Sequence, residues 1–331
     1  MTNKIAYAQP KPQIQKKTHA RNRRLVFCYM SLFIMILFFK NADAAAVWVT
    51  EGLALCAGKL IPSLFPFMAV SSLIVASGLG NAAARVFGKP FRALFGIGGE
   101  GSVAVILGWA CGFPVGAKCA CELYASSRIS HAEYSRLLCI CGTPSPAFLI
   151  ATVGGTMLGS RTSGLGLYLI SIASALILGI ILKLIAPIPQ SNREPPVTNT
   201  AQSSLPLAKV FTRAVSEAAV GMLNVCAFVV FFSAFLGTLE SALSFVTVPR
   251  SVHALLFAFF ELTSGLSAIS SISFISSNLT LPLCALAVGW SGISVHFQTI
   301  AICSAPVSFK PYFLSHTARA IICFLLGMLI L

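Results

Sequence analysis

The sequence predicts an all-α, polytopic helical membrane protein, and two observations carry that prediction. The 331 residues are 56% hydrophobic and only 10% charged, whereas about a quarter of the residues in soluble globular domains are charged. The apolar residues also stand in continuous runs, without the period-two alternation of membrane β-strands. Because a helix satisfies its own backbone hydrogen bonds inside a bilayer, these runs are expected to be transmembrane helices.

A membrane helix needs roughly 20 apolar residues to cross a hydrocarbon core of about 30 Å. The charge-free runs 60–84, 162–182 and 218–239 each reach that length, and residues 262–309 suffice for two spans. With the remaining apolar runs included, we expect roughly eight to ten membrane segments, some of them broken or re-entrant.

Charge and proline content divide the chain into four parts. Residues 1–24 carry seven of the 23 Lys and Arg residues and no acid, which predicts a disordered basic tail. Residues 187–206 hold five prolines among polar residues and form a linker between the membrane halves 25–186 and 207–331. Basic flanks of membrane helices favour the cytoplasm, so the N-terminus is expected there and no nucleic-acid partner is needed to explain the charge. Whether the run 25–39 is a cleaved signal is left open.

Candidate solute-binding residues lie where glycine and proline interrupt apolar runs. In residues 112–118, unwound backbone beside a cation favours an anion site. The alternative is that Lys118 reaches the membrane surface and the glycines serve helix packing. The interrupted stretch 142–146 is expected to line the same cavity or to be a simple kink. The candidates in this half are Gly112, Phe113, Pro114, Gly116, Lys118, Thr143 and Ser145.

The second half holds a matching interruption. Residues 108–113 and 289–294 both begin with Gly-Trp at the end of an apolar run, which indicates two related halves whose broken helices meet near mid-membrane. The candidates here are Ser291, Gly292, Ser294, His296 and Gln298. His296 is expected either to carry a proton or bind solute, or to be a structurally bonded histidine.

Glu261 is the acid that opens the long charge-free run of the second half. An acid inside the membrane is costly, so Glu261 is a candidate site for a coupling ion or proton, unless it lies at the membrane surface. No HExxH, Walker or Gly-x-Ser-x-Gly motif occurs. Cysteines two residues apart, as at 119 and 121, point to different sides of a helix. We therefore expect no enzyme, no metal site and no cofactor.

The segment Gly-Phe-Pro-Val-Gly-Ala-Lys at 112–118 resembles sporulation integral membrane proteins of the nucleoside-recognition (Gate) domain type, found in spore-forming Firmicutes. The similarity extends over residues 62–67, 122–124, 152–154, 261–265, 289–298 and 311–312. One departure is Cys-Gly-Thr-Pro-Ser-Pro at 141–146, which lacks the asparagine usual in the family.

The resemblance implies two Gate-like halves in a carrier or gate needed for spore formation and linked to dipicolinic acid. We therefore predict a transporter of a small polar, anionic solute similar to dipicolinic acid. The expected location is the bacterial cell membrane or the membrane around the forespore, with the solute and the lipid bilayer as partners and a homo-oligomer left open. The alternatives are a nucleoside or nucleobase carrier and a non-transporting membrane scaffold for sporulation proteins.

Overall fold

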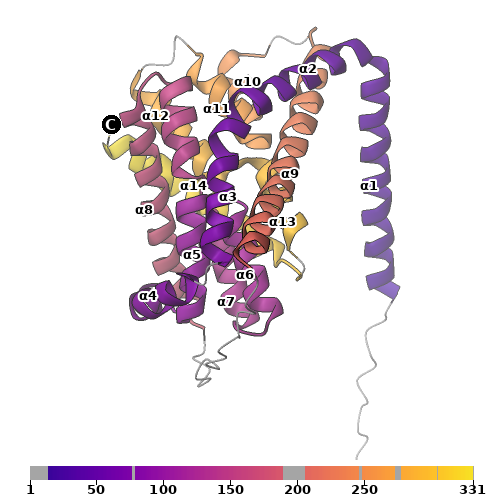
Figure 1. Ribbon diagram of the computed structural model, residues 1–331. Helices are drawn as coiled ribbons and strands as arrows, with labels where there is room; N and C mark the ends of the chain where they lie inside the picture. Colours follow the sequence, from indigo (N-terminus) through magenta and orange to yellow (C-terminus); the bar gives the residue numbers. More distant parts are fainter. Residues whose placement is uncertain are drawn as a thin grey trace, which may run out of the picture.

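The computed structural model describes residues 14–76, 79–188, 206–245, 248–272, 277–303 and 305–330. All regular secondary structure in these ranges is helical, which confirms the predicted all-α membrane fold. Much of the predicted tail and linker, residues 1–13 and 189–205, lies outside the described residues. The helices (Figure 1) are α1 (Ile14–Lys40), α2 (Ala42–Leu55), η1 (Cys56–Leu60), α3 (Ile61–Ala76), α4 (Leu79–Phe95), α5 (Gly99–Cys111), α6 (Val115–Ala125), α7 (His131–Ile140), η2 (Ala147–Met157), α8 (Arg161–Ile185), α9 (Leu207–Ala242), α10 (Arg250–Phe260), α11 (Leu262–Ser270), α12 (Ser277–Trp290), α13 (Gly292–Ile302) and α14 (Phe309–Ile330).

Five helical stretches in the described residues are long and apolar enough to cross a membrane. The bent pair Arg85–Phe95 and Gly99–Cys111 would bring the number in the described residues to six, below the predicted eight to ten segments. The five are Ala42–Val70, Arg161–Ile185, Ala208–Ala242, Leu279–Ile302 and Phe309–Ile330.

The predicted span 60–84 is wrong in its bounds. The long helix begins at Ala42, and α3 ends at Ala76 before α4 begins at Leu79. The span was predicted from the length of a run without charged residues, but Glu51 and Lys59 do not interrupt the helix. The helix continues from α2 through the π-helical turn η1 into α3. In Figure 1, α4 and the start of α1 lie at the same lower end of the molecule.

Two pairs of short helices fold back on themselves as hairpins. A Cβ atom at Gly116 in α6 would lie 2.7 Å from the Cα atom of Gly108 in α5. A Cβ atom at Gly265 in α11 would lie 2.1 Å from the Cα atom of Ala258 in α10. In each pair, glycine is thus what allows the two backbones to touch. Figure 1 shows α5 and α6 in the lower part of the bundle and α10 and α11 in the upper part.

Each hairpin is followed by a helix with an irregular break. Helix α7 and the π-helix η2 are separated by residues 141–146, and α12 and α13 by Ser291. A long helix then follows in both cases, α8 and α14. The order of hairpin, broken helix and long helix therefore occurs twice, as two related halves would require. The relation between the halves themselves stays a prediction.

The specific pairing of residues 108–113 with 289–294 is wrong. The first segment ends at the tip of the hairpin α5–α6, whereas the second lies within the candidate span Leu279–Ile302. The shared Gly-Trp dipeptide does not indicate equivalent positions. Glycine allows close packing in both places, but it packs against different elements. A Cβ atom at Gly108 would meet the carbonyl of Cys141, and one at Gly289 would meet α14 at Ala320.

Candidate functional site

The hairpin tips and broken helices meet around a small, partly open cavity of about 40 Å³. A buried water needs roughly 10–15 Å³ of such space, so the cavity has room for a few waters and is too small for a larger solute. Both halves contribute to its wall. The lining residues are Leu60, Leu64, Phe113, Pro144, Ser145, Phe148, Val225, Val229, Glu261, Leu262, Thr263, Val295 and Gln298.

In the first half, the hairpin tip contacts the break of the following helix. Gly112 has a φ of +80°, and a Cβ atom there would lie 2.6 Å from the backbone nitrogen of Ser145. The backbone N–H of Phe113 donates to the carbonyl of Thr143 at 3.0 Å. The Thr143 hydroxyl in turn donates to the carbonyl of Gly108 at 3.0 Å. These contacts place Phe113 and Ser145 side by side in the cavity wall.

The second half repeats this arrangement with different chemistry. Ser291 and Gly292 both have positive φ angles, of 74° and 81°, so the helix cannot continue regularly between α12 and α13. A Cβ atom at Gly292 would lie 2.9 Å from the backbone nitrogen of Leu262, at the tip of the hairpin α10–α11. Gln298, less than two turns into α13 from this break, lines the cavity.

Glu261 is the charged residue in the cavity wall, and its side chain is 2% exposed. Its carboxylate accepts hydrogen bonds from the backbone N–H groups of Thr263 at 3.0 Å and Ser264 at 2.6 Å. The carboxylate therefore caps the N-terminus of α11, where free N–H groups and the helix dipole favour negative charge.

Several predicted site residues lie outside the cavity wall. Lys118 forms an ion pair with Glu217 of α9 at 2.7 Å, and its side chain is 43% exposed. Glu217 also binds Arg213 at 2.9 Å.

Other predicted residues serve the backbone around the cavity. Gly116 packs the hairpin α5–α6. Pro114 directly precedes α6, and Ser291 and Ser294 are buried, with the Ser291 hydroxyl donating to the carbonyl of Val288 at 3.2 Å.

His296 faces α14 and not the cavity. Its Nδ1 lies 3.0 Å from the hydroxyl of Tyr312, and its ring centroid lies 4.7 Å from that of His316. The ring is 1% exposed. On a helix, residues 296 and 298 point to different sides, which explains why Gln298 reaches the cavity and His296 does not.

Arg319, a fully buried arginine at the middle of α14, was not among the predicted site residues. Its guanidinium donates to the Ser171 hydroxyl at 2.9 Å, to the Ser174 hydroxyl at 3.3 Å and to the carbonyl of Gly142. Within the described part of the chain, no carboxylate forms an ion pair with it. The signal was in the sequence, because an arginine in the centre of an apolar run marks a functional position by default.

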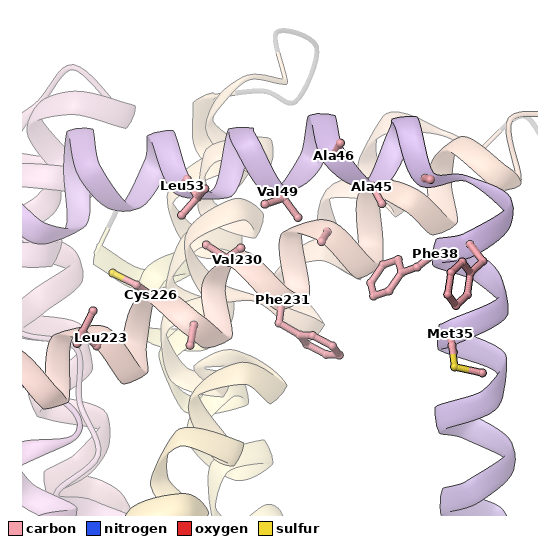
Figure 2. A pocket seen from close by; sticks show the side chains of 14 residues that line it. Met35, Phe38, Ala45, Ala46, Val49, Leu53, Leu223, Cys226, Val230 and Phe231 are labelled. Atoms are coloured by element: carbon pink, nitrogen blue, oxygen red, sulfur yellow. The ribbon is translucent and has the colours of Figure 1, made fainter.

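A larger hollow of about 880 Å³ lies between α1, α2 and α9 (Figure 2). Its lining residues are all apolar, among them Phe38, Val49, Leu223 and Phe231. Figure 2 shows these side chains pointing into the space between the helices. Specific solute sites contain a few placed polar groups, so this hollow suits hydrocarbon chains and is not the candidate site.

Over the described residues, no three His, Cys, Asp or Glu side chains gather as a metal site.

Comparison with known proteins supports a membrane protein of sporulation. The chain is 24% identical over 327 residues to the sporulation integral membrane protein YlbJ of Bacillus subtilis (strain 168), covering 90% of this chain and 80% of that protein. No model of a known protein family matches the chain. No solved structure matches it either. Over most of its length, then, this multi-pass helical protein is similar to a sporulation integral membrane protein.

Proposed function

We propose that this protein is a transporter that moves a small polar solute across a membrane during spore formation. The observation that carries the proposal is the convergence on one cavity of two hairpin tips, the break of the first half and the helix that follows the break of the second half. Broken helices near the middle of a membrane leave backbone groups free to bind a solute, and transporters use them in this way. The similarity to a sporulation membrane protein supplies the physiological setting.

The cavity favours a solute with a carboxylate group, such as dipicolinic acid. The N-terminus of α11 already binds a carboxylate, that of Glu261, through the N–H groups of Thr263 and Ser264. A solute carboxylate would take the same place when Glu261 is protonated, because protonation removes the repulsion between the two acids. Phe113 and Phe148 offer apolar surface to an aromatic ring. In this mechanism each solute enters with one proton.

In this proposal Lys118 contributes to the opening of the cavity and not to the binding of the solute. It lies five residues after Phe113 along α6, and Glu217 lies eight residues before Val225 along α9. The ion pair between them therefore joins a helix of each half on one side of the cavity. Movement of the hairpin α5–α6 away from α9 must break this pair, so the pair closes one exit.

Uptake by the purified full chain in liposomes tests the proposal. Labelled dipicolinate should accumulate faster when the medium is acidified. In Glu261→Ala the N–H groups of α11 are left open, so dipicolinate should still bind while the acceleration by acid disappears. Glu51→Ala, which removes an exposed glutamate of α2, is the matched control and should behave as wild type. Absence of uptake by folded wild-type protein at every pH would contradict the proposal.

A nucleoside carrier is the second candidate, and one observation favours it. No Lys or Arg is among the cavity-lining residues, which suits a neutral solute whose hydroxyls donate to Glu261. This candidate predicts uridine uptake that is lost in Glu261→Ala, opposite to the retained dipicolinate binding expected above. The same two variants, assayed with labelled uridine, therefore separate the candidates.

A further inference from the structure

Two cysteine thiols lie in contact across the boundary between the halves. The Sγ atom of Cys121 in α6 is 3.3 Å from the Sγ atom of Cys303, although 182 positions separate them in the chain. Cys303 directly follows the last residue of α13, one position beyond the candidate span Leu279–Ile302. The contact therefore joins the first hairpin to the end of the second broken helix.

The surroundings of this pair suit reversible oxidation. A disulfide requires the sulfurs to approach to about 2.05 Å, which is a movement of little more than 1 Å from the present contact. Cys303 can supply it, because it is the C-cap residue of α13 and its backbone is already extended. Cys303 is also partly exposed and so open to reagents, while Cys121 is only 4% exposed.

The pair also has a polar neighbour that assists thiolate formation. The Tyr134 hydroxyl lies 3.7 Å from the Sγ atom of Cys121. Hydrogen bonds from Cys121 and Tyr134 lower the pKa of the Cys303 thiol. A thiolate is the form that attacks a disulfide, so Cys303 is the first thiol to react.

We propose that Cys121 and Cys303 are a redox modification site at which a low-molecular-weight disulfide cross-links the two halves. The Cys303 thiolate attacks one sulfur of the reagent, forms a mixed disulfide and releases one thiol. The Cys121 thiol then loses its proton and attacks the Cys303 sulfur, forming the Cys121–Cys303 bond and releasing the second thiol. Two electrons pass to the reagent, which is reduced to two thiols.

The cross-link would hold α6 against the end of α13, three residues from Lys118 on the same helix. Part of the inference rests on the proposed transport function: with α6 fixed, the hairpin α5–α6 cannot leave α9 and uptake stops. The chemical part is independent of transport, since it concerns only which thiols form a bond.

Oxidised glutathione, added to the purified full chain, tests the site. After alkylation of remaining thiols, peptide mass spectrometry should find Cys121 joined to Cys303, and dithiothreitol should restore both thiols. In Cys121→Ser the reaction should stop at the mixed disulfide between glutathione and Cys303. Cys28→Ser, which removes an exposed cysteine of α1, should form the cross-link as wild type does. Both thiols alkylated in oxidised wild type, or a permanent mixed disulfide, would overturn the site.

The locking effect has its own measurement in liposomes that hold oxidised and re-reduced protein. Dipicolinate uptake should fall at least tenfold on cross-linking and recover with dithiothreitol, while Cys121→Ser keeps its rate in glutathione. A cross-linked protein that transports at the rate of the reduced protein would overturn the lock. If reduced wild type shows no uptake, the proposed function fails, while the peptide result still decides the modification site.

Discussion

Glu261 and Arg319 are both buried charges, yet the structure treats them differently. Glu261 lies in the cavity wall and binds two backbone N–H groups at a hairpin tip. Arg319 lies behind the break of the first half, where it binds the Gly142 carbonyl and two serines of α8. The break itself separates them, because Gly142 contacts the arginine while Pro144 and Ser145 line the cavity.

The difference teaches which of the two charges can change during the proposed transport cycle. A carboxylate becomes neutral when it binds a proton, whereas the guanidinium of arginine stays protonated in proteins. Glu261 can therefore lose and regain its charge at the N-terminus of α11. Arg319 keeps its charge throughout, and its hydrogen bonds hold α14 to α8 and to the helix break of the first half.

The largest effect is expected at Arg319. Arg319→Lys keeps the buried charge but has one ammonium in place of a fork, so it loses at least one of three charge-assisted hydrogen bonds. We expect a loss of about 2–4 kcal/mol in the free energy of unfolding. Arg319→Met should lose less, since it also removes the cost of burying an unpaired charge. Thermal and denaturant unfolding in detergent measure both losses. A lysine variant as stable as wild type would show that the hydrogen bonds of the guanidinium do not stabilise the fold.

Gly292 tests how firmly the tip that carries Glu261 is held. Gly292→Ala places a side chain at a φ of +81° and 2.9 Å from the Leu262 nitrogen, so we expect a loss of roughly 1–3 kcal/mol. Gly166→Ala is the matched control, because a Cβ atom there meets nothing within 4 Å. The control should be neutral or slightly stabilising in the same unfolding assay. Equal losses in the two variants would show that the tip is free to move.

At Glu261 the expected effect is on pH dependence and not on stability. The amide of Glu261→Gln can still accept from the N-terminus of α11, so unfolding should change by no more than about 1 kcal/mol. Uptake by wild type should rise as pH falls, up to about tenfold per pH unit for one coupled proton. The variant's uptake should be flat with pH. A variant that keeps the wild-type pH profile would place the coupled proton elsewhere.

The smallest stability effect is expected at the partly exposed pair of Lys118 and Glu217. Charge reversal at Lys118 alone should cost about 0.2–1 kcal/mol, as is usual for exposed ion pairs. The double variant Lys118→Glu with Glu217→Lys should recover part of that loss, and part of the lost uptake, because the swap restores this pair but loses the contacts of Glu217 with Arg213 and of Lys118 with Glu122. Liposome assays of the single and double variants measure the recovery. Failure of the double variant to recover uptake, in a folded protein, would separate the pair from opening.

The fold class could be predicted from the sequence because hydropathy and continuous apolar runs reflect the bilayer directly. Breaks were also predictable, since glycine and proline at 112–116 and 291–292 act on the local backbone. The span 60–84 was misplaced because helices tolerate isolated charges such as Glu51 and Lys59. Local sequence contains no information on how far a charge-bearing helix continues once tertiary contacts support it.

The composition of the site was harder to predict than its location. Phe113, Ser145 and Gln298 line the cavity as their breaks suggested. Lys118 and His296 do not, because each finds a partner on another helix, Glu217 and Tyr312. Such partners lie 99 and 16 positions away, and a pattern read along one segment cannot reveal them. Arg319 was overlooked because no breaker stands beside it.

The position of Arg319 also bears on how the chain is assembled during synthesis. Its acceptors, Gly142, Ser171 and Ser174, belong to segments that are made well before α14, and N-terminal parts of a chain fold first. Until α14 is made, these groups cannot bind the guanidinium of Arg319. The 22-residue helix α14 thus completes the first half of the protein, and a chain whose synthesis stops before α14 leaves an unfinished bundle for quality-control proteases.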